Sequence, residues 1–212
     1  MKKVTIVLPK VILSFPHLIE KQPLDPVYIK TEEQRKYTAT FLLSKKDDAH
    51  ISAVKKMEEE LKNLLSIIKV KQNPHILIKD GDEEYEAIED KDKKAKNEYK
   101  KGNFIITASN KFQPLLNAQG GEVFDLAKHE KLFYPGCYVH GYIELSPYKF
   151  NDVWKGVSNR LQHVQFSKNG NPLGSSGAMS GASEFEKFAE DDEKDDFGTF
   201  KQNSDIPEKD IF

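Results

Sequence analysis

Short runs of apolar and β-branched residues, separated by turn residues, dominate the first half of the chain and predict β-strands. Apolar residues fill 3–8 and 11–15 on either side of Pro9, so we expect a strand pair or one bulged strand there. Residues 36–44 and 104–109 predict two more strands. Turn residues, charged stretches and one long helical segment separate these strands.

The clearest alternation lies in residues 137–145, where successive side chains of a strand should point to opposite faces. One face would carry Cys137, Val139, Gly141, Ile143 and Leu145, and the other Tyr138, His140, Tyr142 and Glu144. Residues 156–166 predict a further strand with Val157, Leu161 and Val164 toward the core. Its two-residue period is broken, which indicates a bulge near Arg160.

One segment follows a helical period. Asp47 or Asp48 would cap its start, and Asn73-Pro74 would end it. Between them, apolar residues recur every three or four positions, which predicts an amphipathic helix of roughly five to six turns. These residues are Ile51, Val54, Met57, Leu61, Leu64, Leu65 and Ile68.

The remaining stretches lack a period. Residues 16–35 and 110–136 predict long connections, and 80–101 predict an exposed, charged excursion with a short helix at its Lys/Glu-rich centre. Gly and Ser residues make 169–183 a flexible linker, and 184–212 is too acidic and too poor in apolar residues to fold alone.

One long helix among about five strands predicts a mainly β protein with an OB-fold-type β-barrel and a disordered acidic tail. A plain α+β sandwich is the alternative. The predicted domains are an OB-fold domain over 1–168, the linker and the tail.

Charge is distributed unevenly along the chain. The net charge is −2, but residues 184–212 contain eleven acidic residues and four lysines, a net of −7, so the other 183 residues carry +5. The excursion adds a second acidic patch, since 80–98 contains nine acidic residues and four lysines. A basic body attracts polyanions, and an acidic tail can compete with them.

Several classes of protein are disfavoured. No P-loop, dinucleotide-binding or G-x-S-x-G motif is present, and the six histidines and single Cys137 lack zinc-site spacing, so we expect no cofactor or metal. No run approaches the roughly 18 apolar residues of a membrane span, and 1–9 is too interrupted for a signal peptide. One cysteine fits a reducing compartment, so we predict a cytoplasmic protein.

Aromatic and basic residues on predicted strands suggest a nucleic-acid surface, because flat rings stack on unpaired bases and cations contact phosphates. Aromatic side chains on strands are more often core, which we weigh most heavily for Phe41 and Phe104. The candidate DNA-binding residues are Tyr37, Phe41, Phe104, Tyr138, His140, Tyr142, Trp154, Lys155, Arg160 and Lys168.

The C-terminal sequence is distinctive, because an acidic stretch ends in an apolar residue and an aromatic one. Asp210, Ile211 and Phe212 bring together a ring, a carboxylate and flanking acids, which suits a partner pocket with an apolar floor and a basic rim. A purely solubilising tail is the alternative.

Three segments resemble a family of bacteriophage single-stranded DNA-binding proteins. They are Tyr134-Pro135-Gly136-Cys137-Tyr138-Val139, the strand from Gly156 to Phe166, and Asn169-Gly170-Asn171-Pro172-Leu173-Gly174. In layout the chain is also similar to the gene-2.5-type protein of T-odd coliphages. The tail is similar to that of bacterial single-stranded DNA-binding proteins, although Asp205-Ile206-Pro207 here precedes a different end.

The resemblance implies an OB-fold that binds single-stranded DNA during phage replication and recombination, with no enzymatic activity. It also implies a tail that recruits DNA polymerase or other replication proteins, and we expect a monomer or a weak homodimer. Two alternatives stay open. One is a metal-dependent nuclease that uses Asp80, Asp82, Glu83 and Glu84, and the other is an adaptor that acts only through its tail.

Overall fold

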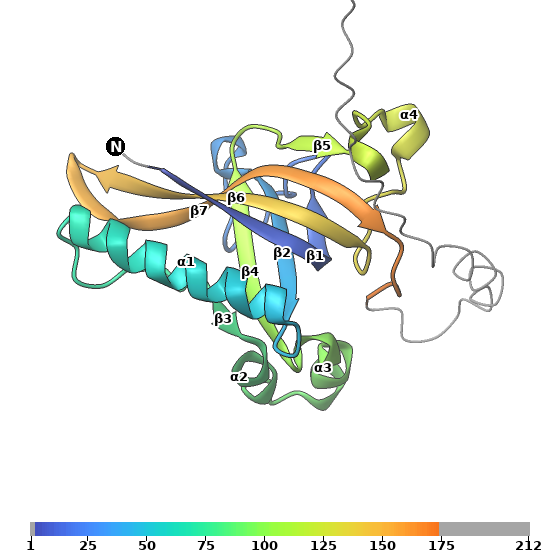
Figure 1. Cartoon of the computed structure of the whole chain (residues 1–212), viewed down its shortest axis with the longest axis horizontal. Coiled ribbons are helices and arrows are strands. Elements are labelled where there is room, and N and C mark those ends of the chain that lie inside the picture. The colour runs from blue at the N-terminus through green and yellow to red at the C-terminus, as the bar shows by residue number, and fades with distance from the viewer. Residues whose placement is uncertain (1–2, 174–212) are drawn as a thin grey trace, which may run out of the picture. The chain divides into compact units, whose positions relative to one another are not determined.

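The computed structural model describes residues 3–173, so the predicted acidic tail and most of the predicted linker lie outside the described residues (Figure 1). No helix within the described part is long and apolar enough to span a bilayer. The elements are β1 Val4–His17, η1 Glu32–Gln34, β2 Tyr37–Ser44, α1 Asp48–Ile67, β3 Lys79–Asp80, α2 Gly81–Glu86, α3 Lys91–Lys96, η2 Glu98–Lys100, β4 Asn103–Asn110, β5 Leu115–Asn117, η3 Gln119–Gly121, α4 Leu126–His129, β6 Tyr138–Phe150 and β7 Val153–Lys168.

Five strands close into a barrel. β1 pairs with β2 on one side and with β6 on the other, β2 continues to β4, and β6 continues to β7, all antiparallel. A parallel contact between β4 and β7, with Ser109 opposite Arg160, closes the ring. This is the topology of an OB-type barrel. The predicted fold is therefore confirmed, and the α+β sandwich is excluded.

A bulge at Pro9 and Lys10 gives β1 its two partners. The pairing of β1 with β6 shifts between Leu8 and Val11, and Lys10 has a φ of 46°. The segment after the bulge pairs with β2 as well as with β6. His50 of α1 fixes this point, because its Nε2 lies 2.8 Å from the Pro9 carbonyl oxygen while its Nδ1 accepts a hydrogen bond from the Ser44 amide at 2.9 Å. Of the two expected arrangements, a strand pair or one bulged strand, the structure shows one bulged strand.

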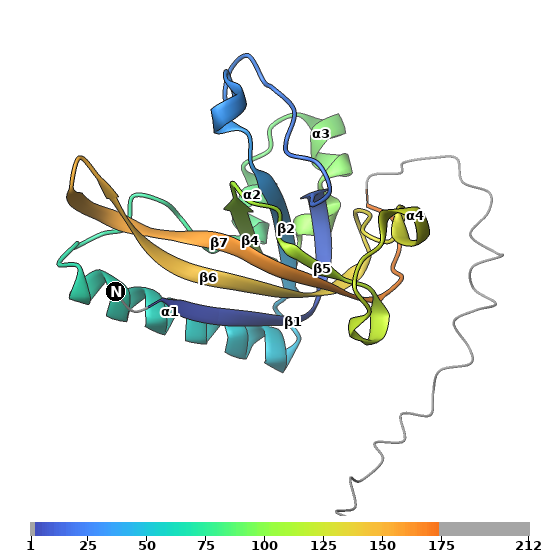
Figure 2. The same cartoon turned by 90° about the horizontal axis from the view of Figure 1, so that it is seen from above.

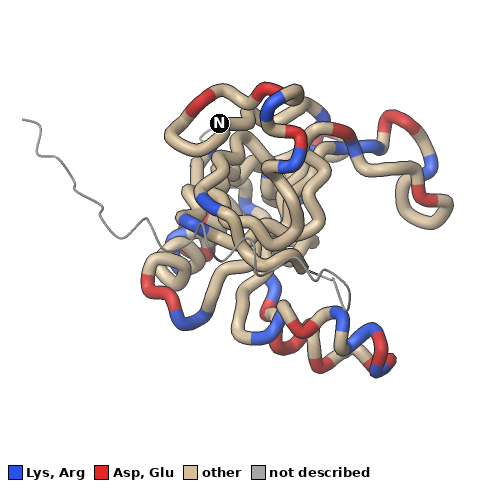
Figure 3. The backbone as a smooth tube through the Cα atoms, turned by 90° about the vertical axis from the view of Figure 1, so that its right-hand side faces the viewer, with Lys and Arg blue, Asp and Glu red and all other residues tan. Residues whose placement is uncertain are grey.

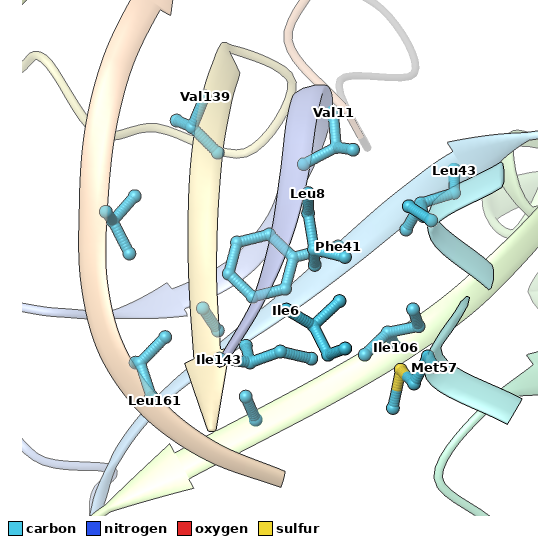
Figure 4. Packing of buried hydrophobic residues seen from close by; sticks show 14 of the residues in the cluster. Ile6, Leu8, Val11, Phe41, Leu43, Met57, Ile106, Val139, Ile143 and Leu161 are labelled. Carbon is cyan, nitrogen blue, oxygen red and sulfur yellow. The ribbon is translucent and has the colours of Figure 1, made fainter. Parts of the chain in front are cut away.

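The interior of the barrel is filled by aliphatic side chains around one aromatic ring. Phe41 is fully buried and lies among Ile6, Leu8, Ile143 and Leu161 (Figure 4). Gly141 of β6 makes room for this ring, since a Cβ on Gly141 would lie 2.9 Å from Cε1 of Phe41. α1 covers one end of the core with residues that include Met57 and Leu64.

The long β6–β7 hairpin is longer than the sequence predicted (Figure 2). The expected bulge near Arg160 is present, because Tyr142 lies opposite His163 and Ile143 opposite Leu161, which leaves Gln162 as the extra residue. Farther along, Asn73 binds the backbone of Val157 through both ends of its amide, at 2.8 and 3.0 Å.

Two segments expected to lack regular structure differ in detail. The stretch 110–136, predicted as a connection, contains the short strand β5, which pairs with β7, together with η3 and α4. The charged excursion over 80–101 contains α2, α3 and η2 rather than one short helix. A three-residue strand carries too few positions to show a period, which explains why β5 was missed.

The contact between Phe41 and Gly141 gives a stability prediction. Replacing Gly141 by Ala should lower the free energy of unfolding by about 1–2 kcal/mol, because overpacking costs roughly 1–3 kcal/mol and the reduced freedom of the unfolded chain returns only about 0.4–1 kcal/mol. Urea denaturation measures this change. In the Gly141→Ala, Phe41→Leu double variant the loss should be smaller than the sum of the single losses. Additive losses would contradict the proposed clash.

Candidate nucleic-acid interface

The alternation of β6 divides its side chains between the core and the solvent, as the sequence predicted. Cys137, Val139, Ile143 and Leu145 have no exposed surface, whereas Tyr138, His140, Tyr142 and Glu144 point outward and are partly exposed. The neighbouring strands β1 and β7 place their own outward residues opposite those of β6. We call the outward side of β1, β6, β7 and β5 the outer face.

An apolar and aromatic stripe crosses the outer face over four strands. Tyr142 and His163 lie opposite one another and stack with their ring centroids 4.8 Å apart and their planes 14° apart. Val7 lies opposite Tyr142 on β1, and Leu115 lies opposite His163 on β5. Both ends of the stripe are open to solvent, since Val7 is 45% exposed and Leu115 is 72% exposed.

Hydrogen bonding fixes the orientation of the stacked histidine. His163 Nε2 lies 2.6 Å from Oδ1 of Asn117, so the ring N–H donates to the amide oxygen and the imidazole is held flat against Tyr142. Burial lowers the pKa of His163, which keeps the ring neutral at neutral pH. The pair is therefore a preorganised, uncharged platform on which a base can stack.

Tyr138 and His140 extend the outer face toward the other end of β6. Lys168 Nζ lies 4.9 Å from the centre of the Tyr138 ring, and Gly170 packs against the edge of the same ring. His140 Nδ1 accepts a hydrogen bond from the Lys10 amide at 3.2 Å. Burial, and to a lesser extent the charge of Lys10, lowers the pKa of His140. Aromatic rings and cations thus lie together here.

Trp154 and Lys155 lie apart from this group, near the tip of the β6–β7 hairpin. Trp154 is partly buried and has Lys149 Nζ 4.8 Å from its ring centre, and Lys155 is exposed. Trp154 and His163 are nine positions apart on β7, which corresponds to roughly 30 Å at about 3.3 Å per residue. The structure therefore does not bring them together with the stacked pair.

Three of the predicted aromatic residues lie on the inward side of the barrel. Phe41 is fully buried, so its prediction as a base-stacking residue is wrong. Tyr37 shares its side of β2 and is half-buried at one barrel end, where Lys21 Nζ lies 5.8 Å from its ring centre. Phe104 is half-buried at the start of β4 with Lys45 Nζ 5.2 Å from its ring centre, and it packs against the core.

His163, Val7 and Leu115 also lie on the outer face, although they are not among the residues predicted from the sequence. The bulge at Gln162 shifts the alternation of β7, so counting along the strand does not reveal that His163 faces outward beside Tyr142. Such a residue could be recognised by its position directly opposite a tyrosine on the paired strand. That position is known only when the register of β6 against β7 is known.

Several carboxylates of the acidic excursion are paired with lysines. Among residues 3–173, no three His, Cys, Asp or Glu side chains are grouped to hold a metal ion. Asp80 and Asp82 both bind Lys45 Nζ, at 2.6 and 2.7 Å, and that bond is the main reason that the pKa of each carboxyl lies below its usual value. Basic and acidic positions are interleaved in this part of the chain (Figure 3). Asp80 and Asp82 are thus engaged by a lysine in this structure.

The closed five-stranded ring with aromatic and cationic residues on its outer face places the chain among OB-type nucleic-acid-binding barrels. A family model confirms the particular group. The model described as "Enterobacter phage Enc34, ssDNA-binding protein" matches residues 4–198, and the chain belongs to this family. The description of the family names single-stranded DNA binding.

The chain is also similar to individual phage proteins. Protein p50 of Acyrthosiphon pisum secondary endosymbiont phage 1 is 29% identical over 195 residues, covering 86% of this chain and 93% of that one. The single-stranded DNA-binding protein from bacteriophage Enc34, solved in complex with single-stranded DNA, superposes with a TM-score of 0.64 at 22% identity over 80% of this chain and 89% of that chain. It shows the same fold. The gp2.5 protein of bacteriophage T7 superposes with a TM-score of 0.46 at 12% identity over 90% of this chain and 96% of that chain, which is too distant to support a conclusion.

The lowered pKa values of the outer-face histidines predict a pH dependence of stability. A histidine whose pKa is lower in the folded than in the unfolded protein stabilises the fold above the unfolded value of about 6.5, and this contribution is lost as the pH falls toward the folded value. The free energy of unfolding should therefore fall between pH 7.5 and 5.5. His163→Gln should show a smaller fall by urea denaturation, and an equal fall in the variant would contradict the role of His163.

Proposed function

We propose that the protein binds single-stranded DNA on the outer face, without strong sequence preference. The Tyr142–His163 stack carries this proposal, because it presents flat, uncharged rings on the solvent side of an OB-type barrel. Every base has a face that can stack, so such a platform tolerates any sequence. The family assignment and the DNA complex of the bacteriophage Enc34 protein support the same conclusion.

The cations on the outer face would contact the sugar-phosphate backbone. Arg160 and Lys168 lie on β7 and Lys10 lies on β1, next to the strand that carries the tyrosines. Each phosphate contact releases counterions, so affinity should fall steeply as salt increases. Trp154 and Lys155 would contribute only to a longer strand that reaches the hairpin tip.

We also propose that residues 184–212 compete with DNA and recruit partners during phage replication and recombination in the host cytoplasm. Their net charge of −7 opposes the +5 of the preceding residues. Asp210, Ile211 and Phe212 would enter a pocket on a DNA polymerase or another replication protein. This segment lies outside the described residues, so sequence alone supports the proposal.

Tyr142 provides the sharpest test of the binding face. Tyr142→Ala should weaken binding to oligo-dT by about 1–3 kcal/mol, the usual effect of removing one stacked ring. Tyr142→Phe keeps the ring and should bind almost as the unaltered protein does. Fluorescence titration at fixed salt measures both, with duplex DNA as the competitor. Equal affinities for all three proteins would exclude Tyr142 from the interface.

Truncation tests the proposed competition by the acidic tail. A chain that ends at residue 183 should bind oligo-dT more tightly than the full chain at low salt, because −7 of competing charge has been removed. Raising the salt should shrink the difference. Phe212→Ala should leave DNA affinity unchanged and abolish pull-down of the replication partner, and loss of both activities would contradict the division of roles.

A further inference from the structure

A carboxylate lies between two cations in the middle of the outer face. Glu144 on β6 is opposite Arg160 on β7 and opposite Thr5 on β1. Its Oε1 lies 3.3 Å from Lys3 Nζ and 3.8 Å from Arg160 Nη1. The side chain of Glu144 is only 14% exposed, whereas those of Lys3 and Arg160 are 53% and 36% exposed. The cations thus reach solvent while the acid that neutralises them is mostly covered.

The three groups are held by charge and not by hydrogen bonds. Oε1 of Glu144 is buried and finds no hydrogen-bond partner among the described residues, although two cations lie within 4 Å. Paired carboxylates in proteins normally accept charge-assisted hydrogen bonds of about 2.7–2.9 Å. Both cations keep much of their surface in solvent, so they can also contact a phosphate from outside while they stay near Glu144.

The position of the cluster suggests which anion would replace the carboxylate. Glu144 is two residues from Tyr142 on the same side of β6, which separates them by roughly 7 Å. If a base of single-stranded DNA stacks on the Tyr142–His163 pair, a neighbouring phosphate of the same DNA strand lies within reach of Lys3 and Arg160. A phosphate could also accept two hydrogen bonds from the Arg160 guanidinium, whereas Glu144 has a single 3.8 Å contact with Arg160 Nη1.

We propose that Lys3 and Arg160 form a phosphate-binding site for the backbone of single-stranded DNA, and that Glu144 occupies this site in the free protein. The inference rests on the proposed function. Glu144 holds both cations in place before DNA arrives and releases them to a phosphate when DNA binds. It therefore limits the affinity of the site and lowers its dependence on salt.

Removing the charge of Glu144 tests this site directly. Glu144→Gln should bind oligo-dT about two- to fivefold more tightly at low salt for each ion pair released. The slope of log affinity against log salt should steepen by about 0.7 for each cation freed. Glu59→Gln on the exposed side of α1 is the matched control, since it changes the net charge equally away from the outer face. It should alter neither quantity by a comparable amount.

A second comparison tests whether the tighter binding of Glu144→Gln depends on Lys3 and Arg160. In a Lys3→Ala, Arg160→Ala background, adding Glu144→Gln should give no increase in affinity and no steeper slope. Thermal unfolding of every variant checks that the barrel is intact.

Three results would overturn the proposal. They are equal slopes for Glu144→Gln and Glu59→Gln, weaker binding by Glu144→Gln, and a gain that persists without Lys3 and Arg160. Failure of the proposed function is distinguishable from these results, because the unaltered protein would then show no binding to oligo-dT at any salt concentration.

Discussion

The pairing of β1 with two different strands, β6 and β2, is the constraint on which the rest of the structure depends. A straight strand would pair with its neighbours over one continuous register, and the bulge at Pro9 and Lys10 instead lets β1 bend from β6 toward β2. His50 secures this bend from α1 through hydrogen bonds to both β1 and β2. Barrel closure, the burial of Phe41 and the orientation of β6 all follow from that geometry.

In the closed barrel, the alternation of β6 determines which of its side chains face solvent and can contact a ligand. Aliphatic residues fill the inside, so Tyr138, His140 and Tyr142 have only the solvent side available. The register with β7 then sets His163 against Tyr142, and β5 adds Asn117 to hold the imidazole. The platform is thus assembled from three strands, and none of them presents it alone.

Much of this architecture could be predicted from the sequence, and the failures have physical causes. Alternation over 137–145 predicted both faces of β6, and the spacing of apolar residues from Ile51 to Ile68 predicted α1. The helix ends at Ile67, before the expected break at Asn73-Pro74. In β2 the run Phe41, Leu42 and Leu43 is buried on both sides, so no alternation shows which way Phe41 points. His163 was hidden by a bulge, whose position depends on pairing that a single strand does not reveal.

Two glycines in the motifs that resemble the family, Gly136 and Gly156, have structural roles. Gly136 has a φ of 111° and packs against the backbone at Asn171, and Gly156 packs against Asn73 and Pro74. Neither glycine carries a side chain that could contact a base. A descendant of this protein could therefore keep both close approaches and exchange every outward residue. The close backbone approaches and the outward binding surface therefore depend on separate positions of this chain.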